Sequence, residues 1–198
     1  MSNGSPTEVK FTFWRRVFLG LWVIVIAGLL VWYIINPLVF TPQAISRFLL
    51  NFQSHIWITY GIVTFLRGFF LIPSTPFVLT GIIIFPDFPF WVLVLSMSGV
   101  IFSATILYYF PEYLGVDRYL DRKYSERMKV VREKANDPKA FWFVLGWSIF
   151  PLVPTDLICN IAGTIRMSYI TMLSGVFLGE GILNTFYVYG GSQLMDRL

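Results

Sequence analysis

The chain contains the stretch Ile72-Pro73-Ser74-Thr75-Pro76, and a second stretch, Phe150-Pro151-Leu152-Val153-Pro154-Thr155-Asp156, repeats its pair of prolines three residues apart. Both stretches interrupt apolar sequence. Proline breaks a helix that it enters, and it disfavours helix at the residue before it. The apolar segment that follows the first pair, residues 77–85, would be about 14 Å long as a helix. Because a bilayer core is about 30 Å thick, this length predicts one arm of a re-entrant hairpin.

The same order of features occurs in both halves of the chain. An apolar arm, the proline pair, a short apolar arm ending near a glycine and a long apolar run follow one another. The long run carries Ser98-Gly99 in the first half and Ser174-Gly175 in the second. Proline-interrupted half-helices in corresponding halves of a membrane chain indicate a transport site. The match is imperfect, because the second short arm is longer.

The sequence as a whole predicts an all-α integral membrane protein. Its expected parts are a cytoplasmic N-terminal tail at 1–16, full transmembrane helices at 17–35, 90–110 and 169–189, hairpins at about 56–86 and 140–165, and an amphipathic helix at about 112–137. The tail and the first span precede a transport domain at 36–198. Asn36-Pro37, Pro111-Glu112 and Gly190-Gly191 are expected to end the three spans, and Thr41 to cap a short helix that starts at Pro42.

The distribution of Lys and Arg along the chain predicts how the chain is oriented in the membrane. Lys and Arg gather in the N-terminal segment and in residues 112–139, so both are expected on the cytoplasmic side. The two hairpins then enter from opposite faces, as an inverted repeat. The two hairpins would not enter from opposite faces if residues 56–71 spanned the membrane fully, which their length allows.

Composition supports membrane burial. Of 198 residues, 56% are apolar and 13% charged, against about 25% charged in soluble domains. The formal net charge of +4 is confined to segments between apolar runs, which favours anionic lipid headgroups over nucleic acid. One cysteine (Cys159) and one histidine (His55) exclude an internal disulfide and argue against a metal site. No hydrolytic motif occurs, so neither an enzyme nor a cofactor is expected.

Four ionisable residues interrupt or border the apolar segments: Arg67, Asp156, Arg166 and Glu180. Each costs about 2.5–3.5 kcal/mol at the centre of an inserted helix, which makes it a functional candidate. Asp156 is the strongest. It would take up a proton, or pair with Arg67 or a lipid ammonium, or act as the N-cap of a helix starting at Leu157.

The other candidates also have two interpretations each. Arg67 would bind a phosphate bidentately, or be a snorkelling or structural partner of Asp156. Glu180 would carry protons or line a cavity, or hydrogen-bond a neighbouring helix. Arg166 is expected to anchor at the interface, and Asn160 to cap or satisfy free backbone carbonyls. The predicted lipid, substrate or coupling site comprises Arg67, Pro73, Pro76, Pro151, Pro154, Asp156, Asn160, Arg166 and Glu180.

Two stretches carry a family resemblance. The first runs from Phe65 to Pro76, with Gly81, and includes Arg67-Gly68 and the first proline pair. The second is Phe150 to Asp156, followed by Asn160-Ile161-Ala162-Gly163, Arg166-Met167-Ser168-Tyr169 and Leu178-Gly179. Over roughly residues 55–190 the chain resembles the DedA/VTT superfamily, also called the SNARE-associated Golgi protein family.

This resemblance implies two opposed re-entrant hairpins and lipid transport. Eukaryotic members of the family resemble phospholipid scramblases. Bacterial members are tied to undecaprenyl phosphate recycling or phosphatidylethanolamine flipping, some with proton coupling. The family often has Arg where this chain has Ser148, and the DedA branch has acidic residues where it has Ser74 and Thr75. These departures favour the VTT-like branch, and passive scrambling over driven export.

Three functions therefore remain open. The first is movement of phospholipid or a polyprenyl-phosphate lipid between leaflets, as a scramblase or flippase. The second is proton-coupled transport of a small solute or ion by Asp156 and Glu180, and the third is a non-transporting scaffold. The expected partners are membrane lipids, and a homo-oligomer is compatible with the sequence. The compact length suggests a prokaryotic plasma membrane, by analogy.

Overall fold

The computed structural model describes residues 6–151 and 153–195. All regular elements within these ranges are helices, and no strand occurs among them. The prediction of an all-α chain is confirmed. The chain divides into two compact units, Met1–Pro37 and Leu38–Leu198, which are described separately.

The first unit is the helix α1, Pro6–Ile35. It starts within the expected tail, with a proline at its first position, where the missing N–H costs nothing. It stops before Asn36-Pro37, as predicted. Residues 1–5 of the tail lie outside the described residues. The apolar part, Val17–Ile35, is long enough to cross a membrane.

In the second unit, the first half of the repeat begins with α2. Thr41 accepts a hydrogen bond from the Ala44 backbone N–H at its Oγ1 atom (3.3 Å), so the predicted cap of α2 is confirmed. The helices of this half are α2 (Pro42–Leu50), α3 (Ile56–Leu66), the 3-10 turn η3 (Arg67–Phe70), α4 (Thr75–Ile84) and α5 (Pro89–Leu114).

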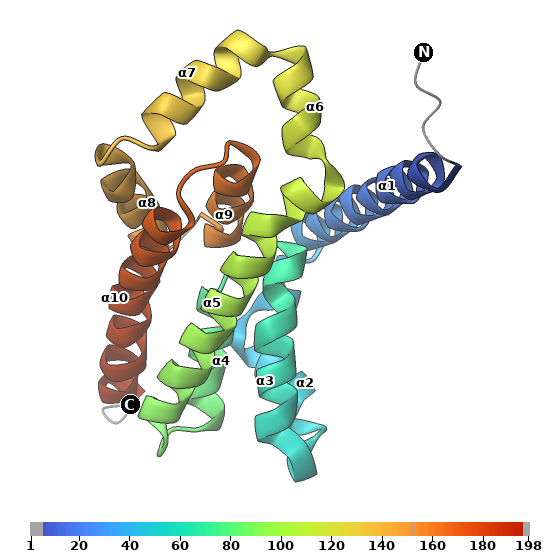
Figure 1. Cartoon of the computed structure of the whole chain (residues 1–198). Helices are drawn as coiled ribbons and strands as arrows, with labels where there is room; N and C mark the ends of the chain where they lie inside the picture. Colours follow the sequence, from blue (N-terminus) through green and yellow to red (C-terminus); the bar gives the residue numbers. More distant parts are fainter. Residues whose placement is uncertain (1–5, 152, 196–198) are drawn as a thin grey trace. The chain divides into compact units, whose positions relative to one another are not determined.

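The second half repeats the order of α3, α4 and α5, which is a helix of 11 residues, a helix of 10 residues and a long helix. Its members are α8 (Lys139–Ile149), α9 (Thr155–Thr164) and α10 (Tyr169–Met195). The two helices of 10 residues, α4 and α9, are called the short helices. Between the halves, α6 (Val116–Lys123) leaves the end of α5 and α7 (Ser125–Ala135) runs from α6 to α8, passing over α9 (Figure 1).

The two halves interlock through their short helices. α9 packs against α5 of the first half, and α4 packs against α10 of the second. Gly163 permits the first contact, because a methyl group there would overlap the backbone oxygen of Tyr108. Gly175 and Gly179 likewise let α10 approach α8 closely. Small residues at helix crossings are the usual packing device inside membranes.

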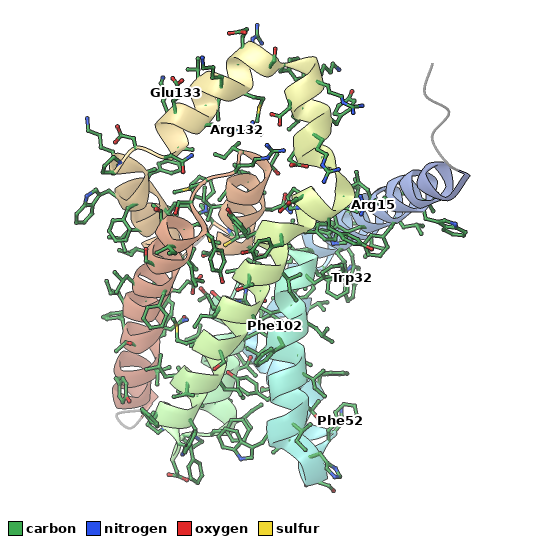
Figure 2. The ribbon with its side chains drawn as sticks, in the orientation of Figure 1. Arg15, Trp32, Phe52, Phe102, Arg132 and Glu133 are labelled. Atoms are coloured by element: carbon green, nitrogen blue, oxygen red, sulfur yellow. The ribbon has the colours of Figure 1, made fainter. Side chains whose placement is uncertain are left out.

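A buried cluster joins α2, α3, α4 and α5. The Tyr60 hydroxyl donates to the Phe77 carbonyl (3.2 Å) and lies 3.2 Å from the Ser96 hydroxyl. Figure 2 shows Phe102 on α5, whose ring lies 5.1 Å from that of Phe65 on α3. Large apolar side chains also face outward, such as Ile170 (75% exposed) and Phe186 (71%) on α10. Such a surface suits lipid rather than water.

Of the described helices, two are long and apolar enough to cross a membrane, Val17–Ile35 and Pro89–Leu114. These agree with two of the three predicted spans. The helix α10 is long enough to be the third predicted span, but Glu180 and Asn184 lower its mean hydropathy. The re-entrant, opposed arrangement of the hairpins stays a prediction.

Two predicted helix ends are wrong, and one predicted helix is divided in two. α5 continues through Pro111 and stops at Gly115, whose positive φ of 74° lets its N–H bond the carbonyls of Pro111 and Glu112. A left-handed glycine is the stronger C-terminal signal. α10 runs through Gly190-Gly191, because a helical glycine costs only about 1 kcal/mol. The amphipathic helix expected at 112–137 is two helices, α6 and α7, with a break at Tyr124.

Candidate functional site

The starts of α4 and α9 bring polar side chains to the middle of α10. Each proline pair ends the preceding helical segment, and a new helix starts at Thr75 or Thr155. Helix N-termini carry free N–H groups and a partial positive charge, which favour nearby carboxylates. The carboxylates here are Asp156, on the first turn of α9, and Glu180 on α10.

Arg67 and Asp156 form a buried ion pair. The guanidinium Nη1 lies 2.8 Å from Asp156 Oδ2 and also donates to the Ile72 carbonyl (3.0 Å). Arg67 is 4% exposed and Asp156 3%. The predicted pairing of the two is confirmed. Asp156 is not the N-cap of a helix starting at Leu157, because α9 already starts at Thr155.

Glu180 accepts hydrogen bonds from three different segments. Ser74, at the start of α4, donates to Oε2 (3.0 Å) and Oε1 (3.2 Å), and the Thr155 hydroxyl donates to Oε1. Asn184 Nδ2 donates to Oε2 at 3.3 Å. Glu180 is 2% exposed. The predicted hydrogen bond to a neighbouring helix is thus present, and it joins both short helices to α10.

We call Arg67, Ser74, Thr155, Asp156, Glu180 and Asn184 the polar cluster. It holds two carboxylates and one guanidinium, and every member is less than a tenth exposed. Two of its atoms, Arg67 Nε and Asn184 Oδ1, are buried without a hydrogen-bond partner. Buried polar groups are normally paired, so these two atoms are available to a ligand. Arg67 Nε can donate to an anion. The second carboxylate gives the cluster an excess of negative charge, which favours a cation.

The four predicted prolines and Asn160 lie close to the polar cluster in the chain. Pro73 and Pro76 flank the start of α4, and Pro151 and Pro154 precede α9, so all four border the polar cluster in the chain. Asn160 lies one turn beyond Asp156, where its backbone carbonyl accepts from Thr164 (2.9 Å). None of these five has a shown role in the site.

Arg166 lies outside the polar cluster. It binds Asp117 Oδ2 through Nη2 (2.7 Å) and Nε (3.1 Å), and its Nη2 atom lies 3.3 Å from Asp121. The hydrogen bond to Asp117 raises the pKa of Arg166. Its side chain is 49% exposed, and it ties the end of α9 to α6.

Ser74, Thr155 and Asn184 belong to the polar cluster but were not among the predicted site residues. Asn184 had a detectable signal, because it lies four residues after Glu180 in an apolar helix and so on the same face. Ser74 and Thr155 each adjoin a proline break, but short hydroxyl residues there also serve as ordinary helix starts. Gly68 lets η3 approach α5, since a methyl group there would meet Ser103 and Asp156.

Comparison with known proteins gives one match. A family model described as the VTT domain matches residues 72–193, which include both short helices, α5 and most of α10. Arg67 lies just before the matched region. No curated protein matches the chain. No solved structure matches it either.

Proposed function

Because this chain belongs to the VTT domain family, we propose that it is a multi-pass transporter that moves a phospholipid or a polyprenyl-phosphate lipid between the leaflets of its membrane. Proteins of this family are membrane-associated and are usually proposed to be transporters. The proposed activity is non-enzymatic, because the lipid changes sides and no bond is made or broken.

The polar cluster carries this proposal. A lipid headgroup resists entering hydrocarbon because its charges lose their water. Arg67 supplies a fixed positive charge whose Nε donor has no partner in the cluster. A guanidinium matches phosphate geometry with two parallel donors. In the proposed cycle the phosphate takes the place of Asp156 at part of the guanidinium, and the freed Asp156 faces the headgroup ammonium where one is present.

The half-helices suit such a passage. Each of α4 and α9 has ten residues, about 15 Å of helix, half the hydrocarbon thickness. If they enter from opposite faces, polar helix ends meet near the midplane and the apolar barrier is thinned on both sides. The acyl chains would stay in lipid, against outward apolar side chains such as Ile170 and Phe186.

The second candidate is a proton-coupled transporter of a small solute or ion. The excess of two carboxylates over one guanidinium in the polar cluster favours it, since a buried charge needs a partner to offset its lost hydration, and a bound cation would supply one. This candidate predicts uptake that follows the proton gradient and is lost in Asp156→Asn. It predicts no movement of lipid headgroups in the absence of a gradient.

The test is reconstitution of the pure protein in liposomes that contain a phospholipid with a fluorescent headgroup. An impermeant quencher then reaches only the outer leaflet, so empty liposomes lose about half of their signal. Lipid transport predicts a loss well beyond half. A loss that stops at half, for several lipids and with or without a proton gradient, would contradict the proposal. Solute uptake driven by the gradient would then favour the second candidate, and its absence a scaffold.

A further inference from the structure

A separate pocket lies beneath α7, where α7, α8 and α9 come together. Its volume is about 360 Å³, within the range of about 300–1,000 Å³ typical of small-molecule sites. Figure 1 shows α7 passing over α9 on its way to α8. None of the polar-cluster residues lines this pocket.

The wall of the pocket is almost entirely hydrocarbon. Val131 comes from α7, Phe143 from α8, and Ile158 and Ile161 from α9. Lys134 and Lys139 are the charged residues of the wall, and no acidic residue belongs to it. The pocket therefore combines an apolar interior with two cations at the junction of α7 and α8.

The two lysines are free to bind an anion. In the described part of the chain neither side-chain ammonium makes an ion pair, and both residues are exposed. The carboxylate nearest to Lys139 in the chain is that of Asp137, whose Oδ1 accepts a hydrogen bond from the Lys139 backbone N–H (2.8 Å) and which, among the described residues, makes no ion pair with either lysine side chain.

Two further carboxylates, on α6 and α7, are engaged or directed elsewhere. Asp121 pairs with Arg132 (2.7 Å), and Figure 2 shows Glu133 on the side of α7 opposite to Arg132. Arg132 itself donates to the Ile165 carbonyl (3.3 Å), on the pocket side of the helix.

We propose that this pocket binds one acyl chain of an anionic phospholipid, whose phosphate is held by Lys134 and Lys139. An apolar cavity with a cationic rim matches a ligand that has a hydrocarbon tail and an anionic head. Basic segments beside a membrane attract anionic lipid, and amphipathic helices lie at the headgroup level. Trp142 (68% exposed) and Phe143 (60%) extend the apolar surface from the pocket toward the surrounding lipid.

The bound lipid would fill the space under α7 and fix that helix over α9. The proposal needs a membrane around the protein but does not need transport. The pocket can bind lipid in a chain that moves nothing, and transport through the polar cluster can occur with the pocket empty. Either proposal can therefore be contradicted by experiment while the other stands.

The test is native mass spectrometry of the full chain in neutral detergent, with added phosphatidylglycerol or phosphatidylcholine of identical acyl chains. Three variants are compared with the wild type. Lys134→Gln/Lys139→Gln removes the rim charges, and Arg127→Gln/Lys129→Gln removes the same charge from α7 residues outside the pocket wall. Ala140→Phe fills part of the cavity from α8.

We expect the wild type to retain one phosphatidylglycerol in preference to phosphatidylcholine. The rim variant should weaken phosphatidylglycerol binding about 25-fold, from about fivefold per lysine, and remove the preference. The control variant should change binding less than threefold, and Ala140→Phe should weaken both lipids. Equal losses in the rim and control variants, or unchanged binding in Ala140→Phe, would overturn the proposal. Because the rim lysines are exposed, their variant tests the headgroup contact even if Ala140→Phe does not fold.

Discussion

At the scale of single residues, Arg67 and Asp156 hold opposite charges 2.8 Å apart, and both residues are buried. Desolvation of two ions costs several kcal/mol each, and their attraction recovers this cost only while both are present. Glu180 is held differently, by neutral hydroxyl and amide donors from three segments. The ion pair and the hydrogen bonds to Glu180 each predict the effect of a substitution on stability.

Asp156→Asn should strongly destabilise the fold, because it leaves the Arg67 charge buried without its counter-ion. We expect a loss of about 3–5 kcal/mol, measured as thermal unfolding in detergent. The matched control is Asp121→Asn, which breaks the partly exposed ion pairs with Arg132 and Arg166 and should cost less than about 1 kcal/mol for each pair. Equal stability of the two variants would show that the buried pair contributes nothing special.

Thr155→Val should cost about 1–3 kcal/mol, because valine has the same shape but leaves Glu180 one donor short. Thr155→Ser keeps the hydroxyl and should recover most of the stability. Thr164→Val is the control, since that hydroxyl bonds only a carbonyl one turn back in its own helix. A serine variant as unstable as the valine variant would mean that packing, rather than the hydrogen bond, is measured.

The individual charges of the site could be predicted from the sequence, but their partners could only partly be. Arg67, Asp156 and Glu180 are visible because a charge within apolar sequence is costly. Ser74 is not visible in that way, because a serine beside a proline has many local uses, whereas Asn184 could have been found from its position four residues after Glu180 in an apolar helix. Their contacts to Glu180 span 106 and 4 residues of sequence, and the longer one depends on the whole fold.

At the scale of helices, the proline pairs determine where α4 and α9 start, and glycines determine how closely they pack. The breaks before both helices could be predicted from the sequence, because a proline removes a helical hydrogen bond wherever it stands. Each helix nevertheless starts two residues earlier than expected, at Thr75 and Thr155 instead of Phe77 and Leu157.

The end of α5 could not be predicted, because Pro111 lies in the last turn and Gly115 supplies a better cap. The break at Tyr124 between α6 and α7 has no proline or glycine to mark it.

Gly163→Ala should separate α9 from α5, because the added methyl group would overlap the backbone oxygen of Tyr108. Overpacking of this kind costs about 1–3 kcal/mol, and thermal unfolding should show the loss. Gly146→Ala on α8 is the matched control, with no atom within 4 Å of the added group. It should leave stability unchanged or raise it by up to about 1 kcal/mol through helix propensity. A Gly163→Ala protein as stable as Gly146→Ala would contradict the close approach of α9 to α5.

At the scale of the second unit, the two halves of the repeat exchange their short helices, so the polar cluster receives side chains from both. η3 and the start of α4 come from the first half, and α9 and α10 from the second. A relative movement of the halves would therefore change the cluster's contacts directly. This coupling is the reason for placing headgroup passage at Arg67 rather than at the exposed Arg166.

The most direct test of the central claim is the liposome assay applied to Arg67→Lys, with Arg132→Lys as its control. Lysine keeps a positive charge beside Asp156 but loses the planar guanidinium that matches a phosphate with two donors. Arg132 is also ion-paired, but outside the polar cluster. With both variants folded and inserted equally, we predict that Arg67→Lys moves lipid at least about tenfold more slowly than wild type, equivalent to about 1.4 kcal/mol, while Arg132→Lys matches wild type. Equal rates in all three proteins would contradict the passage of the headgroup through the polar cluster.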